Sequence, residues 1–349
     1  MIIDFHAHVG DFRTSRKDDR EVLTWERLLG LMDAEGIDKA VHLPVYNASP
    51  EGAPLGFISG KGMAVYDHVV DAARYADRII PFANMDPRWG RNHETTDFGP
   101  LLDFFQEHGC RGVGEVTANI PYDDPRTINM FKQLGARGMM VTIESTNMLP
   151  GHYGFQDDPG APRFERLLQA APETIVIGHG PGFWAEMGPV ASPQEKGGYP
   201  NSCFTEEGSL PRHFRKYPNL YADLSAGSGF NALTRNPDHG VQFLNEFQDR
   251  LLFGADAVSA DLRDRAAQLA RIEEMLDALF TDATPRSSAS LRSTGRARFQ
   301  ALYRTLTCWR TGIMPQLYYL RRLVKLGKIS QQVYEKITWG NGMRLLKKS

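Results

Sequence analysis

Two histidines near the N-terminus are the residues whose type and spacing point most directly to chemistry. His6 and His8 follow Ile2, Ile3 and Phe5, which predict a short buried strand. Successive strand residues point to opposite faces, so histidines two positions apart project from the same face. Neutral imidazole nitrogen is a good ligand for a divalent metal such as zinc. The pair therefore indicates a metal site, although this short pattern alone is as consistent with chance or with two hydrogen-bonded histidines.

The segments that must position these histidines alternate between apolar strands and sequences of helical periodicity. The further strands are expected at Lys39–Val45, Ile79–Asn84, Arg111–Val116, Met139–Glu144, Thr174–His179, Asn219–Ser225 and Arg250–Asp256, and the intervening helices near 21–35, 66–75, 100–108, 126–135 and 162–171. Eight strands alternating with helices predict an α/β fold, a (β/α)₈ TIM barrel. An open doubly wound sheet is the alternative, but the glycine-rich turn expected after its first strand is missing at Val9–Phe12.

The domain organisation follows from the length of 349 residues, which exceeds what a barrel needs. We expect the barrel at residues 1–257 and a helical extension packed on it at 258–349. The extension includes a helix near 261–280 and an exposed loop at 282–298. From Arg286 onward there are fourteen Lys or Arg and one acid, Glu335. Such a run favours the solvated faces of helices over an anion site or an acidic docking surface.

Composition narrows the class of protein. A hydrophobic content of 42%, a charged content of 23% and a net charge of -2 are typical of a globular protein that binds neither nucleic acid nor membrane. The three cysteines are far apart and form no CxxC pair, so neither a disulfide framework nor a thiolate metal site is indicated. No apolar run reaches membrane-spanning length and no signal peptide is evident. We therefore expect a cytoplasmic protein.

Polar residues end several of these apolar strands. In a TIM barrel the active-site groups sit at the carboxyl ends of the strands. Charged side chains are rarely buried there unless they are paired or coordinate a metal. The residues at these ends are His6, His8, Asn84, Glu115, Glu144, His179, Ser225 and Asp256. The fold and the residue types together therefore predict a metal-dependent active site.

Four motifs carry a family resemblance. Asp4–His8, Ile177–Gly182, Asn219–Ser225 and Arg250–Asp256 are similar to segments of the amidohydrolase superfamily. The branch they resemble includes aminocarboxymuconate semialdehyde decarboxylase and the resorcylate decarboxylases, and the closing segment Ile337–Leu346 resembles it too. The resemblance covers residues 1–256 and about 325–346. The motifs are fairly specific for the superfamily and much less specific for the reaction that its members catalyse.

The resemblance implies roles for individual residues. His6, His8 and Asp256 would ligate a divalent metal, most often Zn²⁺ with Mn²⁺ as an alternative, and Asp256 would also handle the proton of an activated water. His179 would lie near the metal and polarise or protonate the substrate. Glu115 resembles the glutamate that bridges two metals in the TatD-like deoxyribonuclease and phosphotriesterase-related branches. One or two ions are therefore expected, and the alternative for Glu115 is a buried carboxylate satisfied by hydrogen bonds.

Glu144 departs from the family pattern. Relatives end the fifth strand with a histidine ligand, whereas this chain reads Val141–Glu144. A carboxylate can coordinate zinc or manganese and makes the site harder and more negative. Glu144 could instead act as a general base or form a structural salt bridge. We therefore count it, like His179 and Glu115, among the possible metal ligands.

The expected substrate contacts come from loops at the barrel mouth. Arg88 and Arg13 could hold an anionic substrate, because guanidinium pairs bidentately with carboxylate. His152 could also contact the substrate. The partner is expected to be a small molecule, and the tail helices could form a homodimer surface.

Three functions are compatible with these residues. The favoured one is metal-dependent hydrolysis of a small-molecule amide, lactone or ester by an activated water. The alternative is non-oxidative decarboxylation of an unsaturated or aromatic acid. In the third, the barrel binds a ligand without turnover, and Glu144 marks a decayed site.

Overall fold

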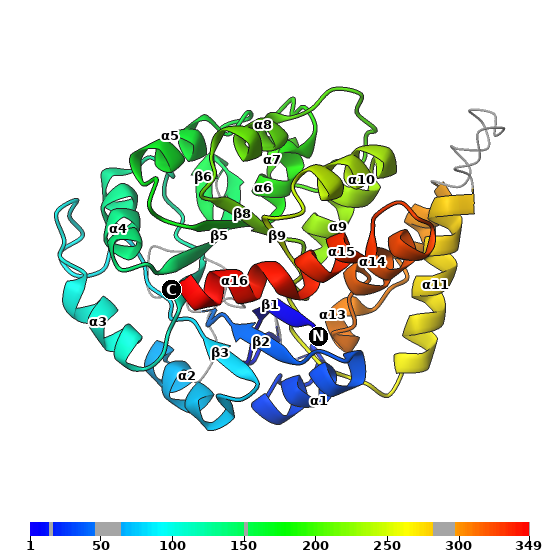
Figure 1. Ribbon diagram of the computed structural model, residues 1–349, viewed down its shortest axis with the longest axis horizontal. Coiled ribbons are helices and arrows are strands. Elements are labelled where there is room, and N and C mark those ends of the chain that lie inside the picture. Colours follow the sequence, from blue (N-terminus) through cyan, green and yellow to red (C-terminus); the bar gives the residue numbers. More distant parts are fainter. Residues whose placement is uncertain (14–16, 46–63, 150–152, 282–296, 349) are drawn as a thin grey trace.

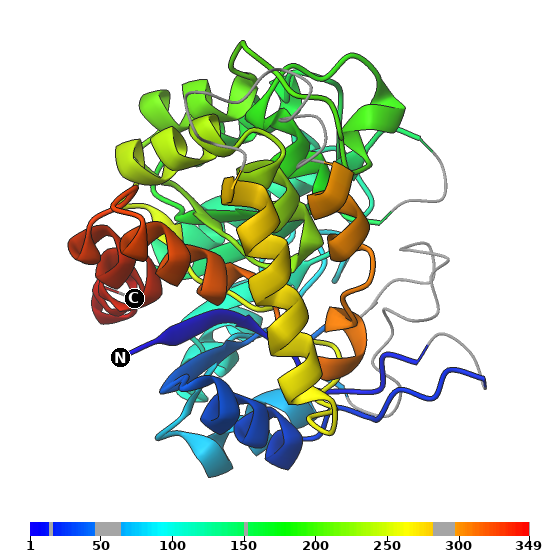
Figure 2. The ribbon, with the colours of Figure 1, turned by 90° about the vertical axis from the view of Figure 1, so that its right-hand side faces the viewer.

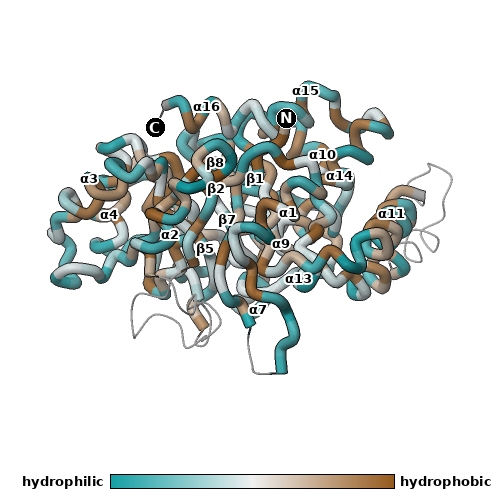
Figure 3. Tube along the Cα trace, turned by 90° about the horizontal axis from the view of Figure 1, so that it is seen from below, coloured by the Kyte–Doolittle hydropathy of each residue, from teal (hydrophilic) through white to brown (hydrophobic). Residues whose placement is uncertain are grey.

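The fold is seen in a computed structural model that describes residues 1–13, 17–45, 64–149, 153–281 and 297–348. The strands are β1 (Ile3–Ala7), β2 (Lys39–His42), β3 (Ile79–Pro81), β4 (Gly112–Val116), β5 (Met140–Asn147), β6 (Phe155–Asp157), β7 (Val176–His179), β8 (Leu220–Asp223) and β9 (Leu251–Leu252). Helices surround these strands (Figure 1). The outer helices alternate hydrophilic and hydrophobic residues, as α3 (Gly99–Glu107) and α11 (Arg265–Thr281) show in Figure 3. Their apolar residues can therefore face the barrel while the polar ones meet solvent.

The strands form an eight-stranded parallel barrel with one addition. One ladder runs β1-β2-β3 and the other runs β4-β5-β7-β8-β9. A bridge between Ala83 and Val113 joins the two ladders on one side, and a bridge between Ala7 and Ala257 joins them on the other. The predicted TIM barrel is therefore confirmed. The short strand β6 pairs with the end of β5 and lies outside this order.

The helices between the strands match the predicted alternation. They are α1 (Trp25–Glu35), α2 (Val65–Ala72) with the 3₁₀ turn η1 (Ala73–Tyr75), α3, α4 (Pro125–Ala136), α5 (Pro162–Ala170), α6 (Pro181–Trp184) with η2 (Ala185–Met187), α7 (Pro193–Lys196), α8 (Ser209–Lys216), α9 (Ala226–Thr234) and α10 (Pro237–Glu246). The helices expected from the sequence before the C-terminal extension end at residue 171, whereas the structure continues with α6 to α10 before β9. Two of these unpredicted helices, α6 and α7, are short. Each is about one turn long and begins at a proline, which leaves no apolar periodicity to detect.

The C-terminal extension continues with α11, a helical segment at 297–303, α13 (Cys308–Thr311), α14 (Gln316–Lys325), α15 (Gln331–Glu335), η3 (Lys336–Gly340) and α16 (Asn341–Lys348). Most of the predicted loop at 282–298 lies outside the described residues. Several basic side chains of the extension contact acidic groups, for example Arg310 with Asp19 at 2.7 Å and Lys336 with Asp249 at 2.8 Å. The extension is thus held partly by charge. No helix among the described residues has the length and apolar character needed to cross a membrane.

The last helix closes the amino end of the barrel. In Figure 1, α16 crosses in front of the strands. Leu345 packs with Ile3 and Phe5 inside the barrel and is 3% exposed. A Cβ on Gly342 would lie 2.9 Å from the Phe5 ring, so only glycine allows this close approach. Asn341 donates from its amide to the carbonyl oxygens of Gln248 and Leu251, at 2.7 and 2.8 Å. The helix thus fills the end opposite His6 and His8.

Replacing the buried leucine of this helix tests its role. Leu345→Ala should lower the free energy of unfolding by about 2–4 kcal/mol, because the change leaves a cavity in the barrel interior. Lys347→Ala, an exposed position of the same helix, is the control and should change stability little. Urea unfolding measures both, and equal stability of the two variants would contradict the proposed closure.

Candidate metal centre

The predicted site residues come together at the carboxyl end of the barrel. Figure 2 shows the N-terminus and α16 at one end, with β1 running from there toward the other. The pairing register shifts between Asp4 and Ala7 in β1 and between Val113 and Val116 in β4. Such irregularities re-aim side chains. They fall at the segments that carry His6 and Glu115, both buried at the barrel mouth.

Two contacts fix the strand end that carries His6. Asp4 accepts hydrogen bonds from the backbone N–H groups of His6 and Ala255, each at 2.9 Å, and thereby ties β1 to the segment after β9. Burial raises the pKa of the Asp4 carboxyl to about 7, and the two hydrogen bonds, which lower the pKa, offset only part of this effect. Asp256 adopts a left-handed backbone with φ of 58°, which is unfavourable for a residue other than glycine. Its N–H donates to the His6 carbonyl at 2.8 Å, which anchors that conformation.

One buried carboxylate orients two of the histidines. Asp223, at the end of β8, accepts from His6 Nδ1 at 3.1 Å and from His179 Nδ1 at 3.0 Å. Ser225 also donates to Asp223 from its backbone N–H and its hydroxyl. Burial would raise the pKa of Asp223, but His179 and His6 outweigh it and hold the pKa well below its usual range. With Nδ1 of both rings facing this carboxylate, both Nε2 atoms face the barrel mouth.

The third histidine is oriented by the backbone. His8 Nδ1 donates to the Leu43 carbonyl at 2.8 Å, and a carbonyl can only accept. In their neutral forms, His6 and His8 therefore both present Nε2 lone pairs, and these atoms lie 3.1 Å apart. Asp256 Oδ1, a further acceptor, lies 2.9 Å from His8 Nε2. Three acceptors this close need a cation or a proton between them.

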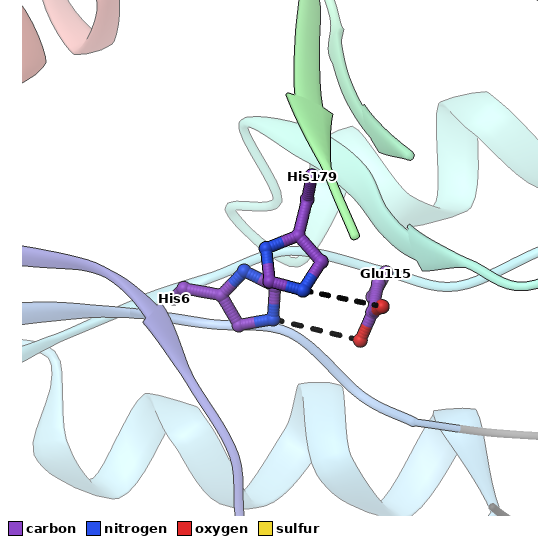
Figure 4. Close-up of side chains that lie close together, drawn as sticks. All are labelled: His6, Glu115 and His179. Atoms are coloured by element: carbon purple, nitrogen blue, oxygen red, sulfur yellow. Dashed lines mark ion pairs between the residues drawn. The ribbon is translucent and has the colours of Figure 1, made fainter. Parts of the chain in front are cut away.

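The donor set fits a divalent metal. Ligands at the usual 2.0–2.1 Å from a tetrahedral zinc are about 3.3 Å apart, and the three separations within the His6, His8 and Asp256 set are 2.9, 3.1 and 3.8 Å. A second converging set is His6, Glu115 and His179, drawn in Figure 4. Glu115 lies 3.5 Å from His6 Nε2 and 3.9 Å from His179 Nε2. His6 Nε2 has one lone pair, so it can serve only one ion.

Glu144 lies beside these sets but belongs to neither. Its Oε2 is 3.5 Å from His179 Nε2, and its carboxyl group lies close enough to that of Glu115 for the two to interact electrostatically. Burial and the neighbouring Glu115 raise the pKa of Glu144 well above its usual range. Burial would also raise the pKa of Glu115, but His6 and His179 outweigh it and lower that pKa. These opposite directions favour the protonated form on Glu144 rather than on Glu115.

A cavity of ≈ 210 Å³ opens beside the cluster. Its lining residues are His8, Phe12, Arg20, Val45, Glu115, Thr117, Glu144, Tyr153, His179, Asp256 and Val258. Arg88 and Arg13, predicted to hold substrate, do not line it, and each pairs with a nearby aspartate, Asp86 or Asp11, at 2.7 Å. His152 lies outside the described residues. The predicted substrate roles of these three residues stay predictions.

Sequence reasoning missed two residues of the site. Asp223 lies within the quoted segment Asn219–Ser225, and a carboxylate in an otherwise apolar strand was an available signal. Arg20 lines the cavity but follows a polar loop without periodicity, and no local pattern distinguishes it from neighbouring arginines. The first could therefore have been found from sequence and the second could not.

The whole chain matches a known family. The amidohydrolase family profile matches residues 3–348. A comparison with curated proteins finds no match. A crystal structure described as probable 2-pyrone-4,6-dicarboxylic acid hydrolase from Acinetobacter baumannii is 14% identical, with a TM-score of 0.52 and 99% of each chain covered. An Agrobacterium tumefaciens structure is 13% identical, with a TM-score of 0.51, covering 100% of this chain and 94% of that one. A 2,6-dihydroxybenzoate decarboxylase from Rhizobium is 15% identical, with a TM-score of 0.49 and coverage of 99% and 98%.

Changing the shared carboxylate tests how the histidines are oriented. Asp223→Asn retains one acceptor oxygen but turns an N–H₂ donor toward the other histidine, whose Nδ1–H then lacks a partner. Zinc affinity should fall by about 10–100-fold. Competition with a chromogenic chelator measures it. Asp86→Asn, which alters another buried aspartate outside the cluster, is the control. Unchanged zinc affinity in Asp223→Asn would show that Asp223 does not position the ligands.

Proposed function

Since the chain belongs to the amidohydrolase family, we propose that it is a metal-dependent hydrolase of a small-molecule amide, lactone or ester. The observation that carries the proposal is the convergence of the His6 and His8 Nε2 atoms with Asp256 beside a cavity. His6, His8 and Asp256 would hold one divalent ion, with Zn²⁺ preferred and Mn²⁺ the alternative. When bound there, the ion lowers the pKa of a water and polarises a substrate oxygen.

In the proposed reaction, Asp256 accepts a proton and His179 stabilises developing negative charge. The Asp256 side chain is 21% exposed, more than the side chains of His6, His8 or Glu115, and it lines the cavity. It is therefore placed to accept the proton of the attacking water, and this proton replaces the one that Glu144 gives to the leaving group, so that the protons balance over one turnover. His179 has its Nδ1 held by Asp223, and although burial would lower the pKa of His179, Asp223 outweighs burial and raises that pKa. In its protonated form, His179 can therefore donate a hydrogen bond from Nε2–H to the oxygen on which negative charge develops.

Glu144 would act on the substrate. It lines the cavity and lies outside both converging donor sets, and burial and Glu115 raise its pKa, which favours its protonated form. A buried, protonated carboxyl can donate a proton to a leaving group. We therefore propose that Glu144 serves the reaction as an acid and is not a metal ligand.

The same proton supports a second candidate function. In a non-oxidative decarboxylation, the carbon that loses carbon dioxide must receive a proton. Glu144 could supply it from the cavity wall, while the ion and His179 hold the substrate. The hydrolase is preferred because Asp256, besides being a proposed metal ligand, offers a partly exposed base, which attack by water needs and decarboxylation does not.

Metal content and products test the proposal together. The purified protein should contain about one equivalent of transition metal, and His8→Ala should lose both the metal and the activity. His108→Ala, a change at an exposed histidine, is the control. Mass spectrometry of the metal and a panel of lactones, amides, esters and aromatic acids provide the readouts. Acid release supports the hydrolase and carbon dioxide release supports the second candidate. A protein without metal, with His8→Ala unchanged, would overturn both.

Replacing Glu144 separates its possible roles. Glu144→Gln should keep its metal and lose about 100-fold or more in turnover, because the amide cannot donate an acidic proton. Glu107→Gln, at an exposed position of α3, controls for general effects. Loss of metal from Glu144→Gln would instead make Glu144 a ligand. Glu144→His adds a further comparison, since gain of a histidine ligand should tighten metal binding only if residue 144 can reach the ion.

A further inference from the structure

A repeated local motif holds several arginines of this protein. In each case an aspartate binds the arginine two residues later, with the arginine backbone N–H and Nε donating to Oδ1 and Nη2 donating to Oδ2. The pairs are Asp11–Arg13, Asp18–Arg20, Asp86–Arg88, Asp124–Arg126 and Asp261–Arg263. The motif fixes the guanidinium plane on its own loop and leaves the Nη1 edge for other partners.

Arg20 differs from the other members by lining the active-site cavity. Its side chain is 11% exposed, and its Nη2 also donates to the Phe12 carbonyl. Its guanidinium carbon lies 5.8 Å from the ring centre of Trp309, in the C-terminal extension. Nη1 has no hydrogen-bond partner within the described parts of the chain. Asp18 and Trp309 therefore hold the Arg20 guanidinium in place from two sides, and its Nη1 group can still bind a ligand.

The other walls of the cavity decide what the Arg20 guanidinium can contribute to ligand binding. Glu115, Glu144 and Asp256 contribute carboxyl groups at the metal end, and Phe12, Val45 and Val258 contribute apolar surface. Among the lining residues that the structure describes, Arg20 supplies the one side chain of fixed positive charge. A substrate anion on this wall can therefore be held by Arg20.

We propose that Arg20 binds a carboxylate of the substrate that is separate from the group that reacts. The substrate is then a small carboxylic acid that also carries the amide, lactone or ester to be hydrolysed. Asp18 offsets part of the cost of burying the guanidinium and holds it in place, while the free Nη1 edge meets the ligand. This assignment rests on the proposed function, because the second group of the substrate must reach the metal.

Two related ligands test the assignment. Benzene-1,3-dicarboxylate can place one carboxylate at the metal and the other at Arg20, whereas benzoate offers only one. In the zinc-loaded protein, the dicarboxylate should bind about tenfold or more tightly than benzoate. Arg20→Met should reduce this ratio to within about twofold, and Arg20→Lys should restore part of it. Isothermal titration calorimetry measures the affinity of each protein for both ligands.

The control uses an arginine held by the same motif outside the cavity. Arg263→Met, at an exposed arginine held by Asp261 in this motif, should keep the ratio of the wild-type protein. Three outcomes would overturn the assignment: equal ratios in the wild-type protein and in Arg20→Met, an equal loss of the ratio in Arg263→Met, or no binding of either acid. Zinc content is measured in each variant. A protein that holds no zinc fails the proposed function, whereas a zinc-loaded protein with an unchanged ratio fails only the role of Arg20.

Discussion

The buried carboxylate of Asp223 is the constraint on which the geometry of the site depends. It binds Nδ1 of His6 from the first strand and Nδ1 of His179 from β7, so one residue sets the direction of two rings. Without it, either imidazole could turn its other nitrogen toward the cavity, and the lone pairs would no longer converge. The backbone carbonyl of Leu43 does the same for His8. The directions of these three rings are therefore set by the protein itself.

Residues that stabilise the fold and residues of the candidate site lie at opposite ends of the barrel. At the amino end, α16 and apolar side chains such as Phe5 and Leu345 fill the interior and stabilise the fold. At the carboxyl end, the same strands end in residues that are costly to bury, including Glu115 and Glu144. The extension serves both ends, because α16 closes one and Trp309 contacts Arg20 at the other. A long C-terminal segment is thus part of the functional unit.

Sequence reasoning could predict what depends on local pattern and on the barrel rule. His6, His8, His179 and Asp256 end strands, and parallel strands bring their carboxyl ends together, so their clustering followed from the fold. The role of Asp223 depends on which face of β8 meets two other strands, and that is a tertiary property. The same limit separates Arg20 from the arginines that share its Asp-x-Arg motif, because only the folded chain shows which of them reaches the cavity.

The central claim is that His6, His8 and Asp256 form one metal site at the barrel mouth. Anomalous diffraction at the zinc absorption edge, from crystals grown with one equivalent of zinc, tests it most directly. The account predicts one strong peak within bonding distance of Nε2 of both histidines and of an Asp256 oxygen, with His6 Nδ1 still on Asp223. A peak that excludes His6 or His8, or no peak at the mouth, would contradict it.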